Sequence, residues 1–132
     1  MKLVVDTNRI IAALVRDGSS REVITKNHTF ITTDFSIEEI NKHKKEILDK
    51  SGMDEPSFDL LIALLFYNIE IVPYSEYKEH IKEARDLMKE RDIKDIPFLA
   101  LALAKKADGI WSDDRDFESQ NKIKIFKTKD LI

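Results

Sequence analysis

Apolar positions along the chain follow two periods, one typical of buried strands and the other of helices. Short β-branched apolar runs predict strands of a mostly parallel sheet that is covered on both faces, and they lie at Lys2–Asp6, Phe30–Thr32, Glu70–Val72, Gly109–Ser112 and Ile123–Phe126. Between them, apolar residues recur every three to four positions. This spacing predicts helices over Thr7–Arg16, around Val23 and Ile24, over Ser36–Lys50, from Asp54 to about Tyr67, from Ser75 to about Arg91, over Phe98–Ala107 and, as a short turn, over Asp113–Phe117.

Strands and helices therefore alternate along the whole chain. This order predicts an α/β fold in which right-handed crossovers place helices on both faces of the sheet. The segment Phe98–Ala107 is apolar nearly all round, which indicates a central, buried helix. The sequence has no internal repeat, low-complexity tract or linker, and 132 residues suit one domain. We therefore predict a single domain over residues 1–132.

Composition narrows the class of protein. The chain is 42% hydrophobic and 36% charged, which is typical of a globular protein. It contains no cysteine, so disulfides, thiolate metal sites and cysteine nucleophiles are excluded, as suits a reducing cytosol. The strand pattern begins at Lys2, which leaves no room for a signal peptide, and no apolar run is long enough to cross a bilayer. We expect a cytoplasmic protein without a membrane partner.

Four acidic residues lie where a predicted strand passes into a helix or in the first turn of a helix: Asp6, Glu39, Asp95 and Asp114. The carboxyl ends of parallel strands meet at one edge of a sheet, where ligands bind. Because clustered carboxylates repel one another, a chain that gathers them usually holds a cation there. The sequence therefore predicts a divalent-metal site with hydrolytic chemistry.

Each acid also has a structural interpretation when it is taken alone. Asp6 could cap the following helix, and Asp95, two residues before Pro97, could do the same. Ser36 and Glu39 match a capping box, with Glu38 as a substitute for Glu39 in the site. Asp114 could belong to a solvated turn. The recurrence of an acid after the first and fourth strands favours the metal site.

Four segments contain the acids and their neighbours: Val4–Asn8, Ile37–Ile40, Asp95–Ala102 and Ala107–Phe117. They resemble motifs of the PIN domain, the nuclease fold of VapC-type toxins and of several RNA-processing and flap nucleases, and the resemblance spans nearly the whole chain. It implies a three-layer α/β/α fold with a five-stranded sheet of order 3-2-1-4-5. In that order the first and fourth strands are neighbours, so Asp6 and Asp114 would face each other.

The resemblance also implies the roles of individual residues. Asp6, Glu39, Asp95 and Asp114 resemble the catalytic quartet, and Asp116 resembles a fifth acid that joins Asp6, Asp95 and Asp114 around the metal. Asp113 occupies a position that is often uncharged, so it stays open whether Asp113 or Asp114 is the principal ligand. The residues expected to support the site are Thr7, Asn8, Glu38, Ser112 and Asp113.

The reaction that the resemblance implies is hydrolysis of phosphodiester bonds in single-stranded RNA, leaving 5′-phosphates. Hard oxygen ligands without His or Cys select Mg²⁺ or Mn²⁺ over zinc. Arg9, Lys94 and Arg115 lie beside the acids in the sequence and are candidate phosphate contacts, although Arg9 could instead pair with Asp6. The net charge of −3 does not argue against RNA, because a metal site concentrates negative charge. An antitoxin protein and a second copy of the chain are candidate partners.

Two alternatives stay open. One is a catalytically weak protein of the same fold that acts in RNA processing or as a scaffold; the apolar segment Phe58–Phe66 would then be a partner surface, although core packing explains it better. The other is an aspartyl-phosphate receiver or phosphohydrolase domain, which also places an Asp after its first strand. That class needs a second acid beside Asp6 and a lysine at a later strand end, for which Lys127 is a poor match.

Overall fold

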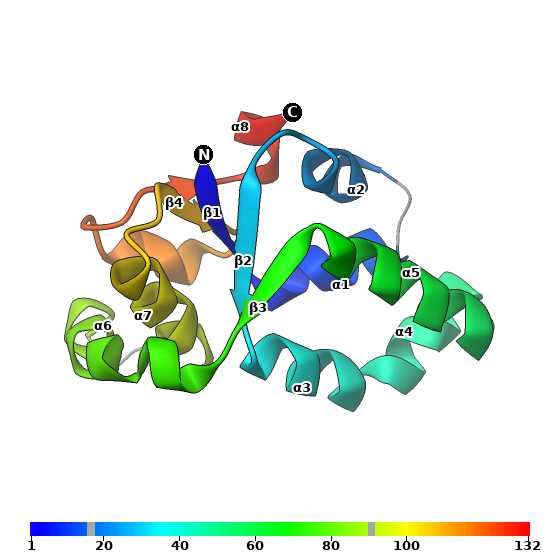
Figure 1. Ribbon diagram of the computed structural model, residues 1–132, viewed down its shortest axis with the longest axis horizontal. Coiled ribbons are helices and arrows are strands. Elements are labelled where there is room, and N and C mark those ends of the chain that lie inside the picture. The colour runs from blue at the N-terminus through cyan, green and yellow to red at the C-terminus, as the bar shows by residue number, and fades with distance from the viewer. Residues whose placement is uncertain (16–17, 90–91) are drawn as a thin grey trace.

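The computed structural model describes residues 1–15, 18–89 and 92–132, so the predicted helix ends at Arg16 and Arg91 lie outside the described residues. Its centre is a parallel five-stranded sheet of order β3-β2-β1-β4-β5 (Figure 1). The strands are β1 (Lys2–Val5), β2 (Thr29–Thr33), β3 (Ile69–Val72), β4 (Gly109–Trp111) and β5 (Ile125–Phe126). The predicted order and the predicted α/β class are confirmed.

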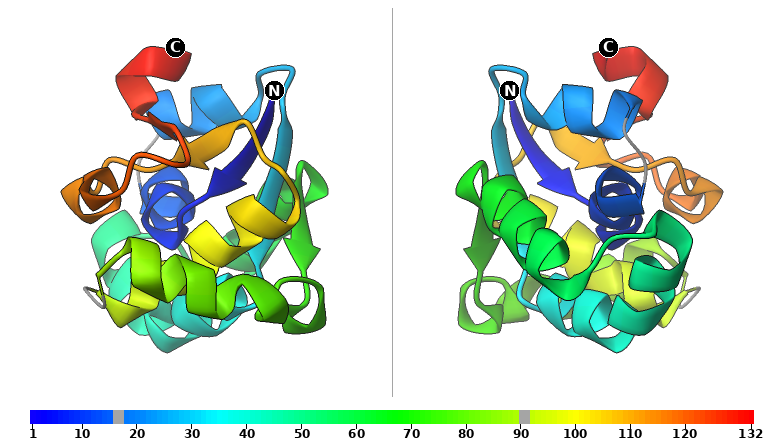
Figure 2. Two further views of the ribbon diagram at one scale, coloured as in Figure 1. Left: turned by 90° about the vertical axis from the view of Figure 1, so that its left-hand side faces the viewer. Right: turned by 90° about the vertical axis from the view of Figure 1, so that its right-hand side faces the viewer.

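Alternate residues of the strands face two separate helical layers. Leu3 and Val5 of β1 belong to one buried cluster, whose helices are α1 (Thr7–Val15), α2 (Ser19–Ile24), α3 (Phe35–Lys42), α4 (Lys44–Ser51), α5 (Glu55–Tyr67) and α8 (Thr128–Leu131). Val4 belongs to the cluster on the opposite face, which α6 (Ile81–Leu87) and α7 (Ile96–Ala104) cover (Figures 1 and 2). Because side chains alternate along a strand, the continuous apolar run of β1 supplies both cores at once.

Helix α7 is the central helix that its composition predicted. Pro97 lies in its first turn, and Ile96 and every residue from Phe98 to Ala102 are buried against β1, β2 and β4. It ends at Ala104, three residues before the predicted end. Lys106 has a φ of 50°, and the amide of Ala107 donates to the carbonyl of Ala102. The left-handed residue closes the helix as such a C-terminal motif requires.

Two predicted helices are broken in the structure, and those predictions were wrong in detail. The segment Ser36–Lys50 forms α3 and α4, separated at His43, whose φ of −100° and ψ of 9° leave the helical region. The segment from Ser75 forms two single 3₁₀ turns before α6 begins at Ile81. There Asp34 accepts hydrogen bonds from the Tyr74 amide and the Tyr77 hydroxyl at 3.0 and 2.6 Å. These tertiary bonds override the local helical pattern.

Two further elements differ at the surface. The apolar helix α5 buries Phe58 and Leu65, as core packing predicted, but it also exposes a row of apolar side chains at Leu60, Leu64 and Tyr67. The four-residue helix α8 was not predicted. Within the described residues, no helix combines the length and the apolar character that a membrane span requires.

Candidate metal centre

The register between β1 and β4 brings two site residues together. Val5 pairs with Trp111, so Asp6 and Ser112 follow side by side at the carboxyl ends of neighbouring strands. The hydroxyl of Ser112 donates to Asp6 Oδ2 at 2.7 Å and accepts from the amide of Asp114 at 3.0 Å. Ser112 therefore fixes Asp6 and the turn that carries Asp114, and the two acids converge as the sheet order predicted.

The two consecutive aspartates after β4 point to different partners. Asp113 Oδ2 lies 2.6 Å from Arg9 Nη1, and its carboxylate accepts from the amide and hydroxyl of Thr128 at 2.9 and 2.8 Å. Asp114 Oδ1 accepts from the amide of Asp116 at 2.9 Å at the start of the 3₁₀ helix η4 (Arg115–Ser119). Asp114 is thus the aspartate that faces the other acids, while Asp113 is held by Arg9 and α8.

Asp95 is buried at the start of α7, where the 3₁₀ turn η3 (Ile93–Asp95) precedes the helix. It occupies the N-cap position, yet its side chain makes no capping hydrogen bond. Asp95 is 6% exposed, and its Oδ2 is buried without a hydrogen-bond partner in the part of the chain that the structure describes. A buried carboxylate oxygen without a donor is costly unless a proton or a cation reaches it.

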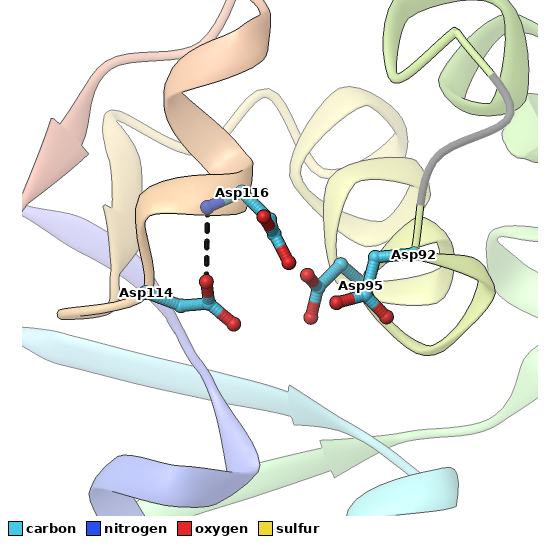
Figure 3. A group of neighbouring side chains, drawn as sticks. All are labelled: Asp92, Asp95, Asp114 and Asp116. Atoms are coloured by element: carbon cyan, nitrogen blue, oxygen red, sulfur yellow. Dashed lines mark hydrogen bonds between the residues drawn. The ribbon is translucent and has the colours of Figure 1, made fainter.

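Four carboxylates from two segments form one cluster (Figure 3). One oxygen from each lies within 4.8 Å of one oxygen from each of the others, and the residues are Asp92, Asp95, Asp114 and Asp116. Three of them were predicted metal ligands. Asp92 was not predicted, although its spacing three residues before Asp95 is the spacing that brings side chains together on one turn. Asp6 lies outside this group but lines the same pocket as Asp95 and Asp114.

The pocket has a volume of about 90 Å³ and brings the predicted quartet together; its lining residues are Asp6, Thr7, Asn8, Glu39, Asp92, Lys94, Asp95, Phe98 and Asp114. Thr7 positions Glu39, because the buried Thr7 hydroxyl lies 3.1 Å from Glu39 Oε1 and 3.2 Å from Ser36 Oγ. Ser36 is not a helix cap, since α3 begins at Phe35 after Asp34. The exposed Glu38 does not line the pocket.

The predicted phosphate contacts are placed differently from one another. Lys94 is exposed and lines the pocket. Arg115 is exposed and lies outside the lining. The Arg9 guanidinium pairs with Asp113 rather than with Asp6; Arg9 also lines a larger groove of about 600 Å³ that runs over α1 and α4. Asn8 lines both hollows, so the groove opens directly beside the acidic pocket.

The electrostatics of the pocket favour a positive ligand. Burial raises the pKa of Asp6 to about 6, with a smaller contribution from the charge of Asp114, although the Ser112 hydrogen bond acts in the opposite direction. Burial, followed by the charges of Asp6, Asp92 and Asp114, raises the pKa of Asp95 to about 8. Both shifts express the cost of holding negative charge in a dry and acidic site, a cost that a bound cation removes.

The donors present fit a hard divalent cation. All the clustered groups are carboxylate oxygens, which suit Mg²⁺ and Mn²⁺. The buried and unpaired Oδ2 of Asp95 is a ligand atom already held in place.

The chain is similar to known proteins over nearly its whole length. A family model described as the PIN domain matches residues 4–129. Among solved structures, a chain in the crystal structure of VapBC2 from Rickettsia felis, which is bound to a DNA fragment from the VapBC2 promoter, is similar to this chain with a TM-score of 0.74. The match covers 96% of this chain and 98% of that chain at 14% sequence identity, a level at which the likeness shows the fold alone. A search of the curated proteins found no match.

Proposed function

We propose that this chain, which belongs to the PIN domain family, is a Mg²⁺- or Mn²⁺-dependent endoribonuclease that hydrolyses phosphodiester bonds of single-stranded RNA. The observation that carries the proposal is the acidic pocket, in which separate segments of the chain bring carboxylates around the buried, unpaired Oδ2 of Asp95. Such a pocket requires a cation, and the family is one of nucleases.

Asp95, Asp114 and Asp116 are the residues that would hold the cation. Asp6 adds a ligand atom from the inner wall, because its Oδ2 is bonded to Ser112 at 2.7 Å, whereas its Oδ1 has a long contact of 3.5 Å to the amide of Asn8. When bound, the cation would activate a water and stabilise charge on the leaving oxygen. Glu39, held by Thr7, is placed in the same pocket to accept a proton from that water.

Lys94 is the residue best placed to contact the scissile phosphate. It is exposed and lines the acidic pocket, and it has no ion pair among the residues that the structure describes. The neighbouring groove offers an approach for an unpaired strand, because it joins the pocket at Asn8. A single strand fits this arrangement, since a phosphate must reach carboxylates that lie inside a narrow pocket.

The likeness to VapBC2 supports a role as the toxin of a toxin–antitoxin pair in the cytoplasm. An antitoxin or a second copy of the chain would cover the exposed apolar row of α5, at Leu60, Leu64 and Tyr67. Exposed apolar side chains in a row mark surfaces that bind other proteins. Co-expression with the product of a neighbouring small open reading frame, followed by co-purification, is the measurement that checks this role.

The nuclease activity is tested with end-labelled single-stranded RNA. Cleavage should require Mn²⁺ or Mg²⁺, stop in EDTA and leave 5′-phosphates. Asp114→Asn should lower the rate by a factor of about 100 or more, because it removes a group that holds the cation. Asp49→Asn is the matched control, since it removes the same charge from an exposed position on α4. Equal rates in the Asp114 variant and the wild type would refute the proposal, because the activity would belong to another site or another protein.

The aspartyl-phosphate alternative has less support. The lysine that the sequence offers for this role is Lys127, which does not line the pocket of Asp6 and pairs with Glu118 at 3.3 Å. Incubation with a small phosphodonor, followed by mass spectrometry of the intact chain, separates the two functions. An acyl-phosphate on Asp6 would favour the receiver class over the nuclease.

A further inference from the structure

Asp92 is an acid of the pocket that neither the sequence pattern nor the quartet includes. It precedes the η3 turn and is exposed, and it lines the acidic pocket together with Asp6 and Glu39. One of its oxygens lies within 4.8 Å of an oxygen of each of Asp95, Asp114 and Asp116. Figure 3 shows these four side chains pointing toward one another from two segments of the chain.

A second observation, independent of the clustering, indicates a ligand between these side chains. Asp95 is 6% exposed, and its Oδ2 has no hydrogen-bond partner in the described part of the chain. The carboxylate is directed at the cluster. Protein interiors leave few polar atoms unpaired, so this oxygen is free to accept a partner from the pocket. Because the neighbouring groups are carboxylates, a cation is the partner that their charge favours.

The backbone fixes Asp92 in this direction. Its φ of 37° and ψ of 83° are left-handed, a conformation that Asp and Asn adopt more readily than other residues with side chains. The carbonyl of Asp92 accepts the amide of Asp95 at 3.0 Å. This bond closes the turn, and the side chains of Asp92 and Asp95 lie next to each other beside it.

We propose that Asp92 is a direct ligand of the divalent cation, which it shares with Asp95, Asp114 and Asp116. This inference rests on the proposed function and adds a residue to its site. Asp92 supplies the outer wall of the cation site at the solvent side, whereas Asp95 supplies the buried wall. The η3 turn thereby becomes a part of the metal site rather than a connection between α6 and α7.

The test measures Mn²⁺ binding to the full-length chain by titration calorimetry, after removal of metal with EDTA. Asp92→Asn should weaken the binding constant about 10- to 100-fold, as expected for a lost group in a metal site. Asp49→Asn removes the same charge from an exposed position that lines neither hollow, so it should leave the constant unchanged. Asn tolerates a positive φ, and a thermal melt checks that the variant is folded.

Water-proton relaxation then separates ligation from a through-space effect of charge. Loss of a ligand should add about one water to the Mn²⁺ bound by Asp92→Asn, because the cation fills the vacated position. Unchanged binding in this variant, or weaker binding with the same number of bound waters, would overturn the role of Asp92 and leave the proposed function standing. Failure of the wild type to bind Mn²⁺ at all would overturn both.

Discussion

Replacing Asp6 by Asn should stabilise the metal-free protein. The pKa of Asp6 is about 6 in the folded state and 3.8 without the fold, a difference of about two pKa units. Each unit corresponds to 1.36 kcal/mol, so the ionised carboxylate lowers the stability by about 3 kcal/mol above pH 7. Asn is the size of the neutral acid and can still accept from Ser112. The gain in the free energy of unfolding is therefore about 3 kcal/mol at most, or roughly 10 °C in Tm.

The sign of the pH dependence is fixed by the same shift. Between pH 4 and 6 the folded state binds more protons at Asp6 than the unfolded state does, so the stability of the wild type falls as pH rises through this window. The difference between variant and wild type should be about a fifth of its full value at pH 4 and nearly the full value by pH 7. It is measured by urea unfolding in EDTA, with Asp49→Asn as the control. A difference that does not change between pH 4 and 7 would refute the reasoning.

Two further outcomes follow from the structure. Mn²⁺ binding should tighten as pH rises from 6 to 8 and should release protons, because burial and neighbouring charges hold the pKa of Asp95 at about 8 and the cation needs the ionised form. Calorimetry in buffers of different ionisation enthalpy measures the protons released. Binding that does not depend on pH would contradict this prediction. Gly109→Ala should destabilise the protein by about 2–4 kcal/mol in urea unfolding. The added carbon would lie 2.6 Å from the Lys124 carbonyl oxygen and 2.5 Å from the Phe126 ring. An unchanged midpoint of urea unfolding would show that β5 moves aside freely.

The strands and the central helix could be predicted because their signals are local. The run from Leu3 to Val5 is buried on both faces, and α7 is apolar nearly all round. Neither segment could lie at the surface without exposing apolar side chains, so burial is the only interpretation of each pattern. Helix breaks could not be predicted in this way. The seven-residue spacing from Ile40 to Ile47 fits one continuous helix across His43, and both residues belong to the same core.

The convergence of the acids could be predicted in part. Asp6 and Asp114 lie at neighbouring strand ends, and the sheet order alone brings these together. The choice between Asp113 and Asp114 could not be made from the sequence, because it depends on Arg9 and Thr128, which are distant in the chain. Asp92 was missed for a similar reason, since its direction depends on a left-handed backbone that Asp tolerates but that the sequence pattern does not require.

The ion pair between Arg9 and Asp113 explains how the fold tolerates so dense a set of acids. Three aspartates lie within the four residues from Asp113 to Asp116, and all of them in one pocket would repel. Arg9 removes one, since it holds Asp113 at 2.6 Å on the side of α8. Asp114 stays in the pocket, where its charge helps to raise the pKa values of Asp6 and Asp95. The metal-free fold thus carries a charge repulsion that a cation removes, so cation binding and folding stability must be linked.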